Sequence, residues 1–240
     1  MARTLNLAVH TVRREAFVEA AQRLMQARGW AQVSIQDVLD AVEASRGAFY
    51  HYFDSKQALL EAVIDRMVDA GLGSVEPIVD EPNLTATAKL AKLFAGIGRW
   101  KTDRKDVILG FLDVWLSDDH AVVREHFRRK MVTRFVPVLA KIVRQGIDDG
   151  SFHVDSPEAT ARVLMMLIQG LQEEATDLFV ARQANTIGYD EVVSRLAAHT
   201  GAFERLLGAE AGSITLIDKP VLEAWYGKPA RRANGGDHRS

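Results

Sequence analysis

Apolar residues recur along most of the chain with the 3.6-residue period of an α-helix, and the alternation typical of β-strands is nearly absent. The pattern predicts a first helix that ends at Gly29 and two short helices that follow Ser34 and Ser45, residue types that often cap helix N-termini. A fourth helix is expected to begin after Asp54 or Ser55. The expected fold class is therefore all-α.

Residues 71–82 contain glycines, prolines and acidic residues, which predict a loop between two modules. Longer helices are expected to follow this loop, over residues 85–101, 104–116, 121–148, 157–184 and 189–207. Pro137 lies inside the third of these and is expected to kink it. After Gly212 the apolar pattern weakens, so residues 213–240 are predicted to be a C-terminal extension that is partly disordered.

The composition is that of an ordinary globular protein, with 240 residues, 48% hydrophobic and 26% charged. The chain has no cysteine, which excludes disulfides, thiolate metal sites and a cysteine nucleophile. No apolar run approaches the ~20 residues that a membrane helix needs, and the N-terminus lacks the apolar stretch of a signal peptide. We therefore expect a soluble, cytoplasmic protein with no membrane association.

The net charge is −2, but the charges are unevenly distributed along the chain. Residues 1–56 carry seven basic and six acidic side chains, and residues 228–240 carry four basic and one acidic. The segment between them carries 19 basic and 25 acidic side chains. A polyanion is therefore expected to meet the ends of the chain rather than its middle.

The stretch from Ser34 to Leu60 carries the clearest functional signal. Two short helices joined by a turn of three or four residues cannot fold alone, and flanking helices must supply their core. This arrangement is typical of a helix-turn-helix, whose second helix enters the major groove of DNA. Gly47 leaves room for a close approach on that helix, and Lys56 begins the next one, where free N–H groups and a cation suit a phosphate.

The order and spacing of these residues resemble the N-terminal signature of the TetR family of transcriptional regulators. The resemblance covers about residues 12–65 and is carried by the first helix ending at Gly29, Ser34-Ile35 with Asp37-Val38 and Ala41, the run SRGAFYHYF from Ser45 to Phe53, and Lys56 with Leu59-Leu60. The rest of the chain resembles the family in helical pattern and length. Glu43 departs from the glycine usual in the turn and would be strained if its φ is positive. Leu39 replaces a usual alanine, and the tail after Gly212 is longer than usual.

The resemblance implies a role for each residue of the hairpin. Ser34 and Lys56 would contact phosphates, Ser45 would cap the recognition helix, and Arg46, Ala48 and His51 would face the groove. Tyr50 would reach the backbone or a base edge, and Tyr52 is a further candidate DNA contact. Structural alternatives remain open for several of them: the two serines can act only as caps, Tyr52 can be a packing ring, and His51 can be simply solvated.

The middle of the chain is rich in aromatic residues and methionine, which usually form a core. The family resemblance also implies an adaptable apolar cavity for a small-molecule effector. The candidate lining residues are Trp100, Phe111, Trp115, Met131, Met165 and, as a polar group, Gln169. The last two long helices carry wide apolar stripes that a monomer would expose, so we expect a homodimer formed through them.

No sequence pattern supports catalysis or a cofactor. A metal site formed by Asp118, Asp119, His120 and His126 is disfavoured, because histidines six residues apart do not share a helix face, and the two acidic residues are interpreted as a helix cap. We therefore expect residues 1–56 to form a three-helix DNA-binding module and residues 57–212 a helical ligand-binding and dimerisation bundle. The expected function is repression at double-stranded operator DNA, relieved by an apolar effector. The alternatives are a helical ligand-binding protein or enzyme without DNA binding, and an activator of the same family.

Overall fold

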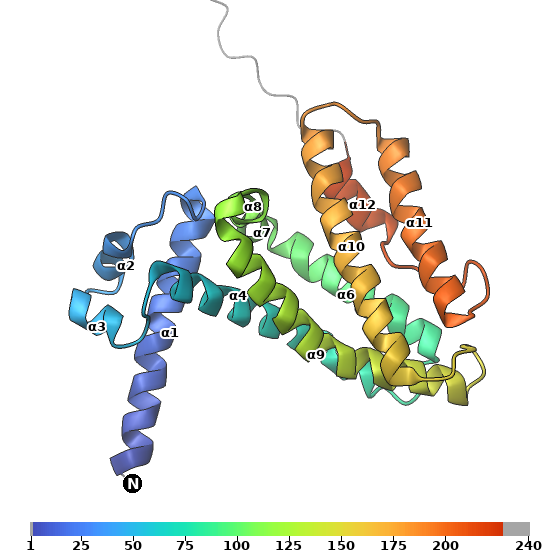
Figure 1. Cartoon of the computed structure of the whole chain (residues 1–240), viewed down its shortest axis with the longest axis horizontal. Helices are drawn as coiled ribbons and strands as arrows, with labels where there is room; N and C mark the ends of the chain where they lie inside the picture. Colours follow the sequence, from blue (N-terminus) through green and yellow to red (C-terminus); the bar gives the residue numbers. More distant parts are fainter. Residues whose placement is uncertain (1, 228–240) are drawn as a thin grey trace, which may run out of the picture.

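The protein is described from a computed structural model, which covers residues 2–227 and the side chains of residues 10–227. The described chain is helical throughout its regular structure (Figure 1). The N-terminal helices are α1 (Ala2–Arg28), α2 (Ile35–Ala41), α3 (Arg46–Tyr50) and α4 (Lys56–Gly73). The remaining helices are α5 (Glu76–Val79), α6 (Ala86–Asp103), α7 (Lys105–Leu109), α8 (Leu112–Leu116), the 3-10 turn η1 (Asp118–His120), α9 (Ala121–Asp148), α10 (Pro157–Gln183), α11 (Tyr189–Leu207) and α12 (Lys219–Tyr226).

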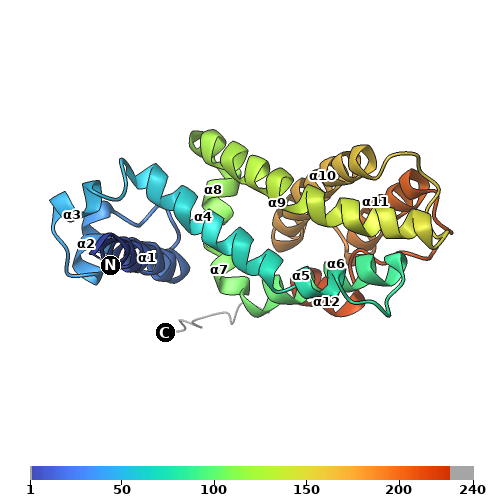
Figure 2. The same cartoon turned by 90° about the horizontal axis from the view of Figure 1, so that it is seen from below.

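The molecule is elongated, with α2 and α3 at one end and α10, α11 and α12 at the other (Figures 1 and 2). Helices α4 and α9 run between the two ends and pack against each other. Helix α10 packs against both α9 and α11. The structure therefore has the expected all-α architecture, with a small helical unit joined to a larger bundle.

Two apolar clusters form the core, and the cluster beneath the hairpin continues beyond residue 56. It contains Phe17, Phe49 and Phe53 and extends through α4 to Val107 and Phe111. The other cluster fills the bundle of α6 and α9 to α12. Helices α1 to α3 therefore share one buried cluster with α4, α7 and α8, the helices that join them to the bundle.

Three predicted segments differ in the structure. The single helix expected over residues 104–116 is divided into α7 and α8 around Gly110, whose backbone lies so close to α1 that an added Cβ would be 2.8 Å from the Met25 carbonyl oxygen. The expected loop over residues 71–82 contains the short helix α5, where Pro77 occupies the first turn and displaces no hydrogen bond.

The predicted C-terminal extension contains the third difference, helix α12. Asp218 caps it by accepting a hydrogen bond from the Val221 N–H. Ile214, Leu216 and Tyr226 of this segment are buried in the bundle core. Sequence periodicity missed the helix because eight residues span little more than two turns. The remainder of the extension, residues 228–240, lies outside the described residues.

Candidate nucleic-acid interface and ligand cavity

Serine side chains begin each of the three helices that follow α1. The Ser34 Oγ accepts a hydrogen bond from the Asp37 N–H, and the Asp37 carboxylate accepts one from the Ser34 N–H, which completes a capping box. Ser45 Oγ accepts from the Ala48 N–H, and Ser55 Oγ accepts from the Ala58 N–H. The predicted caps are therefore present, and of the two alternatives at the fourth helix the structure selects Ser55.

Asp37 also connects α2 to the end of α1. An Arg28 guanidinium nitrogen lies 2.8 Å from the Asp37 carboxylate. Arg28, together with hydrogen bonds from Ser34, holds the pKa of the Asp37 carboxyl well below its usual range. Because the Ser34 hydroxyl also donates to Asp37 at 2.6 Å, its proton is already engaged within the hairpin. Sequence analysis identified Ser34 as a helix cap but gave no indication of the contact between Arg28 and Asp37.

Helix α3 is anchored by one buried ring and presents most of its other side chains to solvent. Phe49 is fully buried and packs against Phe17 of α1, with their ring centroids 5.8 Å apart. Arg46 and His51 are exposed, as is Tyr50 with 47% of its surface accessible. Gly47 is exposed and Ala48 is half-buried. The outer face of α3 is therefore free for contact, while the inner face fixes its position.

Tyr52 lies on the side of the hairpin that faces α1. Its ring is half-buried, 5.8 Å from the Phe17 ring and 4.6 Å from the His10 ring. The His51 ring is 5.4 Å from His10 on the same side. This geometry favours the packing alternative for Tyr52, whereas His51 remains exposed beside it.

Lys56 is held by the loop between α1 and α2. Its Nζ donates a hydrogen bond to the Trp30 carbonyl oxygen at 3.2 Å and lies 4.7 Å from the centre of the Trp30 ring. Partial burial lowers the pKa of this ammonium group. The contact ties the start of α4 to the α1–α2 loop, a role that the sequence did not indicate.

The turn between α2 and α3 carries the strain that the sequence predicted. Glu43 has a φ of 51°, in the left-handed region that glycine adopts without cost. Leu39 is buried, and its carbonyl accepts a hydrogen bond from the Ala44 N–H across the turn. Glu43 and Leu39, the two residues that depart from the usual family pattern, therefore both belong to the turn between α2 and α3.

A second candidate site is an apolar cavity of about 320 Å³ inside the larger bundle. Helices α4, α6, α7, α8, α9, α10 and α12 all contribute to its wall. Four of the six predicted lining residues are present: Trp100, Phe111, Trp115 and Met131. The volume is at the small end of the range for ligand sites in proteins.

Met165 and Gln169 lie outside the wall of this cavity, so the structure does not bring them together with the other four predicted residues. Met165 is fully buried in the bundle core, and the Gln169 amide donates to the Arg128 carbonyl oxygen at 3.4 Å on α9. The face of α10 that does line the cavity is spaced three and four residues apart: Ile168, Leu171, Gln172, Ala175, Thr176 and Phe179. Gln172 is therefore the glutamine of this helix at the cavity.

Helix α12 closes part of the cavity with residues that sequence analysis did not consider. Trp225 donates from its indole N–H to Thr102 Oγ1 at 2.9 Å, and the Tyr226 hydroxyl donates to the Ala175 carbonyl at 2.9 Å. Burial raises the pKa of Tyr226 well above its usual range. The amphipathic spacing of residues 219–226 could have indicated a helix, but it covers too few turns to distinguish a helix from a loop.

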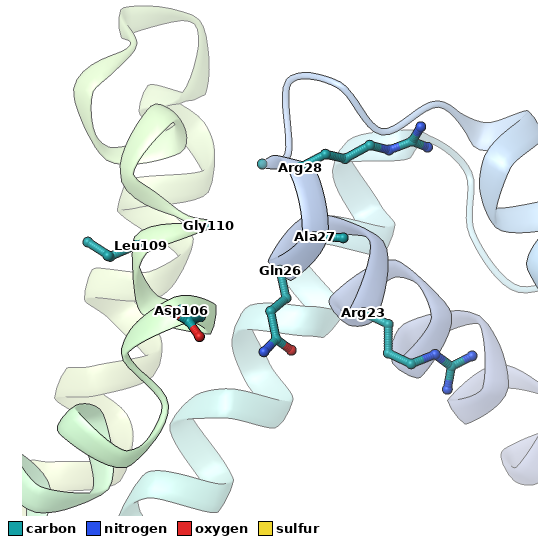
Figure 3. Close-up of a pocket in the computed structure, with 8 residues that line it drawn as sticks. Arg23, Gln26, Ala27, Arg28, Asp106, Leu109 and Gly110 are labelled. Carbon is teal, nitrogen blue, oxygen red and sulfur yellow. The ribbon is translucent and has the colours of Figure 1, made fainter. Parts of the chain in front are cut away.

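Where α7 and α8 meet the end of α1, the two candidate sites approach each other. The Asp113 carboxylate accepts a hydrogen bond from the Ala31 N–H at 2.7 Å. A shallow surface cleft separates α1 from α7, and in Figure 3 Arg23 and Arg28 extend away from α7 while Leu109 points away from α1. Leu109 also lines the cavity, so α7 borders both the cleft and the cavity.

Within residues 2–227, no helix has the length and apolarity to cross a bilayer. The Asp118–His120 segment forms η1, where the Ser117 hydroxyl accepts a hydrogen bond from the Asp119 N–H. His126 Nε2 lies 2.9 Å from the Asp65 carboxylate on α4. Across the described side chains, no cluster of three or more histidine and acidic residues is arranged to bind a metal.

Comparison with known proteins places the hairpin in a family. The family model "Bacterial regulatory proteins, tetR family" matches residues 17–63. The HTH-type transcriptional repressor DhaR of Mycobacterium sp. (strain GP1) is 26% identical over 158 residues, which cover 65% of this chain and 79% of the relative.

Solved structures of the same fold include a TetR transcription regulator from Haloarcula marismortui, with a TM-score of 0.58, 20% identity, and coverage of 82% of this chain and 97% of that one. The structure of RolR in complex with resorcinol has a TM-score of 0.58 at 16% identity, and covers 93% of this chain and 98% of that chain. From the capped hairpin, the family match over residues 17–63 and the curated relatives, the chain carries the DNA-binding domain of the TetR family of transcriptional regulators.

Proposed function

We propose that the protein is a homodimeric repressor that leaves its operator when a small, largely apolar effector occupies the cavity. Residues 1–56 would be the DNA-binding unit, residues 57–212 the effector-binding and dimerisation unit, and residues 213–240 a C-terminal extension, of which residues 216–226 contribute to the cavity wall. The observation that carries the proposal is that the outer face of α3 is exposed, while the buried ring of Phe49 fixes the position of the helix. Relatives that are named as repressors support the direction of regulation.

The proposed DNA contacts fall into two kinds. Arg46, Tyr50 and His51 are exposed on or beside α3 and would meet the groove, where Gly47 and Ala48 allow a close approach. Ser34, Ser45 and Lys56 lie at helix starts and would face phosphates, with the two serines acting first as caps. Tyr52 would act mainly by packing against α1, and so by holding His51 in place.

The proposed coupling runs through α4 and α7–α8. Ile64 and Val68 of α4 and Phe111 belong to the core beneath the hairpin and also line the cavity. Lys56 ties the start of α4 to the α1–α2 loop, and Asp113 ties α8 to the same loop. A ligand that pushes on α4 or Phe111 would therefore move the hairpin, and a coupling of about 1–3 kcal/mol changes operator affinity roughly 5–150-fold.

The proposed dimer forms through α10 and α11. Val163, Met166 and Val180 of α10 are exposed, with 68% of the Met166 surface accessible. Large apolar side chains that share a helix face and remain exposed in a single chain favour burial against a second copy. A twofold dimer would present its recognition helices to successive turns of one DNA groove, roughly 34–36 Å apart.

The test separates base reading from phosphate contact. A duplex selected from a random-sequence pool and a scrambled duplex of the same composition would be titrated at several salt concentrations. Arg46→Ala should weaken the selected duplex more than the scrambled one, by about 1–3 kcal/mol per half-site if the guanidinium reads a base. Lys56→Ala should weaken both duplexes equally and lower the salt slope by about one per subunit.

Arg144→Ala is the matched control, because Arg144 pairs with Glu158 at the far end of α9. It should bind both duplexes as the wild type does. Equal losses on the two duplexes for Arg46→Ala would make Arg46 a backbone contact. No loss for either hairpin variant would overturn the proposed interface.

A further inference from the structure

Lys101 contributes the one basic side chain among the described lining residues of the largely apolar cavity. It lies in the last turns of α6 beside Trp100, and both residues line the wall. Among the described residues, no carboxylate or hydrogen-bond acceptor contacts the Lys101 ammonium. Burial lowers its pKa, because the charged form has exchanged water for an apolar wall without gaining a partner.

The same helix contains a buried lysine that the fold does satisfy. Lys89 is only 5% exposed, and its Nζ donates a hydrogen bond to the Val79 carbonyl oxygen at 2.6 Å. Lys105, just after α6, similarly donates to the Ala224 carbonyl at 2.6 Å. Lys101 lies between these two lysines in sequence, but its ammonium group donates to no carbonyl oxygen of the described residues. A bound ligand could therefore accept a hydrogen bond from it.

The other polar groups of the wall are mostly engaged with the protein. Asp218 accepts the Val221 N–H and lies 4.0 Å from the Arg99 guanidinium. The Thr176 hydroxyl donates to the Gln172 carbonyl oxygen at 2.9 Å. The Gln172 side-chain amide is a second group at the wall with no hydrogen bond to a described residue, and it can donate as well as accept. The polar groups of the wall that remain free to bind a ligand, Lys101 and Gln172, are therefore mainly hydrogen-bond donors.

We infer that the effector is a compact apolar or aromatic molecule with one carboxylate, which pairs with Lys101 while its body fills the ring-lined space. This rests on the proposal that the cavity is the effector site. A single cation in a cavity of about 320 Å³ matches a single negative charge. A phosphate ester would bring nearly two charges into a wall that offers one, so its desolvation would be poorly compensated.

The experiment compares ligands that differ only in charge. 4-Phenylbutanoate and 4-phenylbutanamide would be titrated into the full-length protein by calorimetry without DNA. The acid should bind the wild type about tenfold more tightly than the amide, since a hydrogen bond to a charged group contributes more than a neutral one. Lys101→Met should remove this preference, and Lys101→Arg should keep most of it.

Lys92→Met is the matched control, because Lys92 is an exposed lysine of the same helix that does not line the cavity. It should keep the preference of the wild type for the acid. If Lys101→Met fails to fold, the acid–amide pair on the wild type still decides the question. Equal affinities for acid and amide, or a preference that survives in Lys101→Met, would overturn the inference.

The same titrations separate this inference from the proposed function. If the amide binds as tightly as the acid and both release the selected duplex, the effector site stands and the carboxylate inference fails. If the acid binds through Lys101 without releasing the duplex, the inference stands and the coupling fails. Binding of neither probe would overturn the inference, and the hairpin interface would still be decided by the Arg46 titration.

Discussion

Aromatic side chains fill the core beneath α3 but enclose a cavity beneath α6, although both regions draw on the same residue types. Phe17, Phe49 and Phe53 pack with ring centroids about 6 Å apart and are all buried. In the bundle, Trp100 and Trp115 are half-buried and border about 320 Å³ of open space. The difference lies in the arrangement of the helices rather than in composition.

This contrast corresponds to the two tasks proposed for the protein, DNA recognition and effector binding. Reading DNA requires side chains held at fixed positions, and the hairpin achieves this with three serine caps and a filled core. Binding an effector requires room, and the bundle leaves it by spacing α6, α9 and α10 around the cavity. The first region is therefore expected to tolerate little change in its core, and the second to tolerate more.

The largest expected effect comes from deleting the same ring in each region. Phe49→Ala should lower the free energy of unfolding by about 3–5 kcal/mol, because the ring is fully buried in a closed core. Phe94→Ala should lower it by less than half as much, because Phe94 of the bundle core is only half-buried and already borders the cavity, so it loses fewer contacts. Urea unfolding followed by circular dichroism measures both, and equal losses would contradict the contrast between the two cores.

The next effect concerns two exposed apolar residues of nearly equal accessibility. Met166 on α10 is 68% exposed and Val12 on α1 is 69% exposed. Met166→Glu should weaken the dimer about a hundredfold or more, since each interface would bury two new charges. Val12→Glu, the matched control, should leave the dimer intact. Sedimentation over a range of protein concentrations distinguishes the two, and a wild type that is already monomeric would refute the proposed interface.

Local sequence signals predicted the hairpin because each of its elements is determined within a few residues. Ser34, Ser45 and Ser55 begin helices in the structure, as expected from their positions before apolar runs. The side-chain contacts that connect these helices were not predictable in this way. Arg28 reaches Asp37 and Lys56 reaches Trp30 only after the loops have folded.

The cavity was predicted less well because its wall is drawn from seven helices that are distant in sequence. A ring at the surface of one helix lines the cavity only if no neighbouring helix covers it, and that depends on packing. Gln169 and Gln172 are both glutamines on α10, but only the second has the rotational position that faces the cavity. Lys101 and Trp225 carried no local signal that distinguished them from surface residues.

The contact between the two regions can be tested at a glycine. A Cβ on Gly110 would lie 2.8 Å from the Met25 carbonyl oxygen, so Gly110→Ala must push α7 and α8 away from α1. We expect a loss of about 1–3 kcal/mol in stability and a weaker effect of ligand on DNA affinity. Gly73→Ala is the control, because an added Cβ there meets nothing within 4 Å. Unchanged ligand response in Gly110→Ala would argue against coupling through α7–α8.

The smallest expected effect compares the two non-glycine residues that have positive φ within the described chain, one in each region. Glu43 at φ 51° lies in the α2–α3 turn, and Asn185 at φ 55° follows α10. Asparagine adopts this conformation more readily than glutamate, because its short polar side chain bonds locally.

Glu43→Gly should therefore stabilise the protein by about 0.5–1 kcal/mol, after the greater flexibility of glycine in the unfolded chain has offset part of the relieved strain. Asn185→Gly should change stability by a few tenths of a kcal/mol at most. Both differences would appear as shifts in urea midpoint at constant slope. Because the caps and Phe49 hold α3 independently of the turn, Glu43→Gly should leave DNA affinity unchanged. A loss of affinity together with a gain in stability would instead show that the strained turn sets the angle of α3.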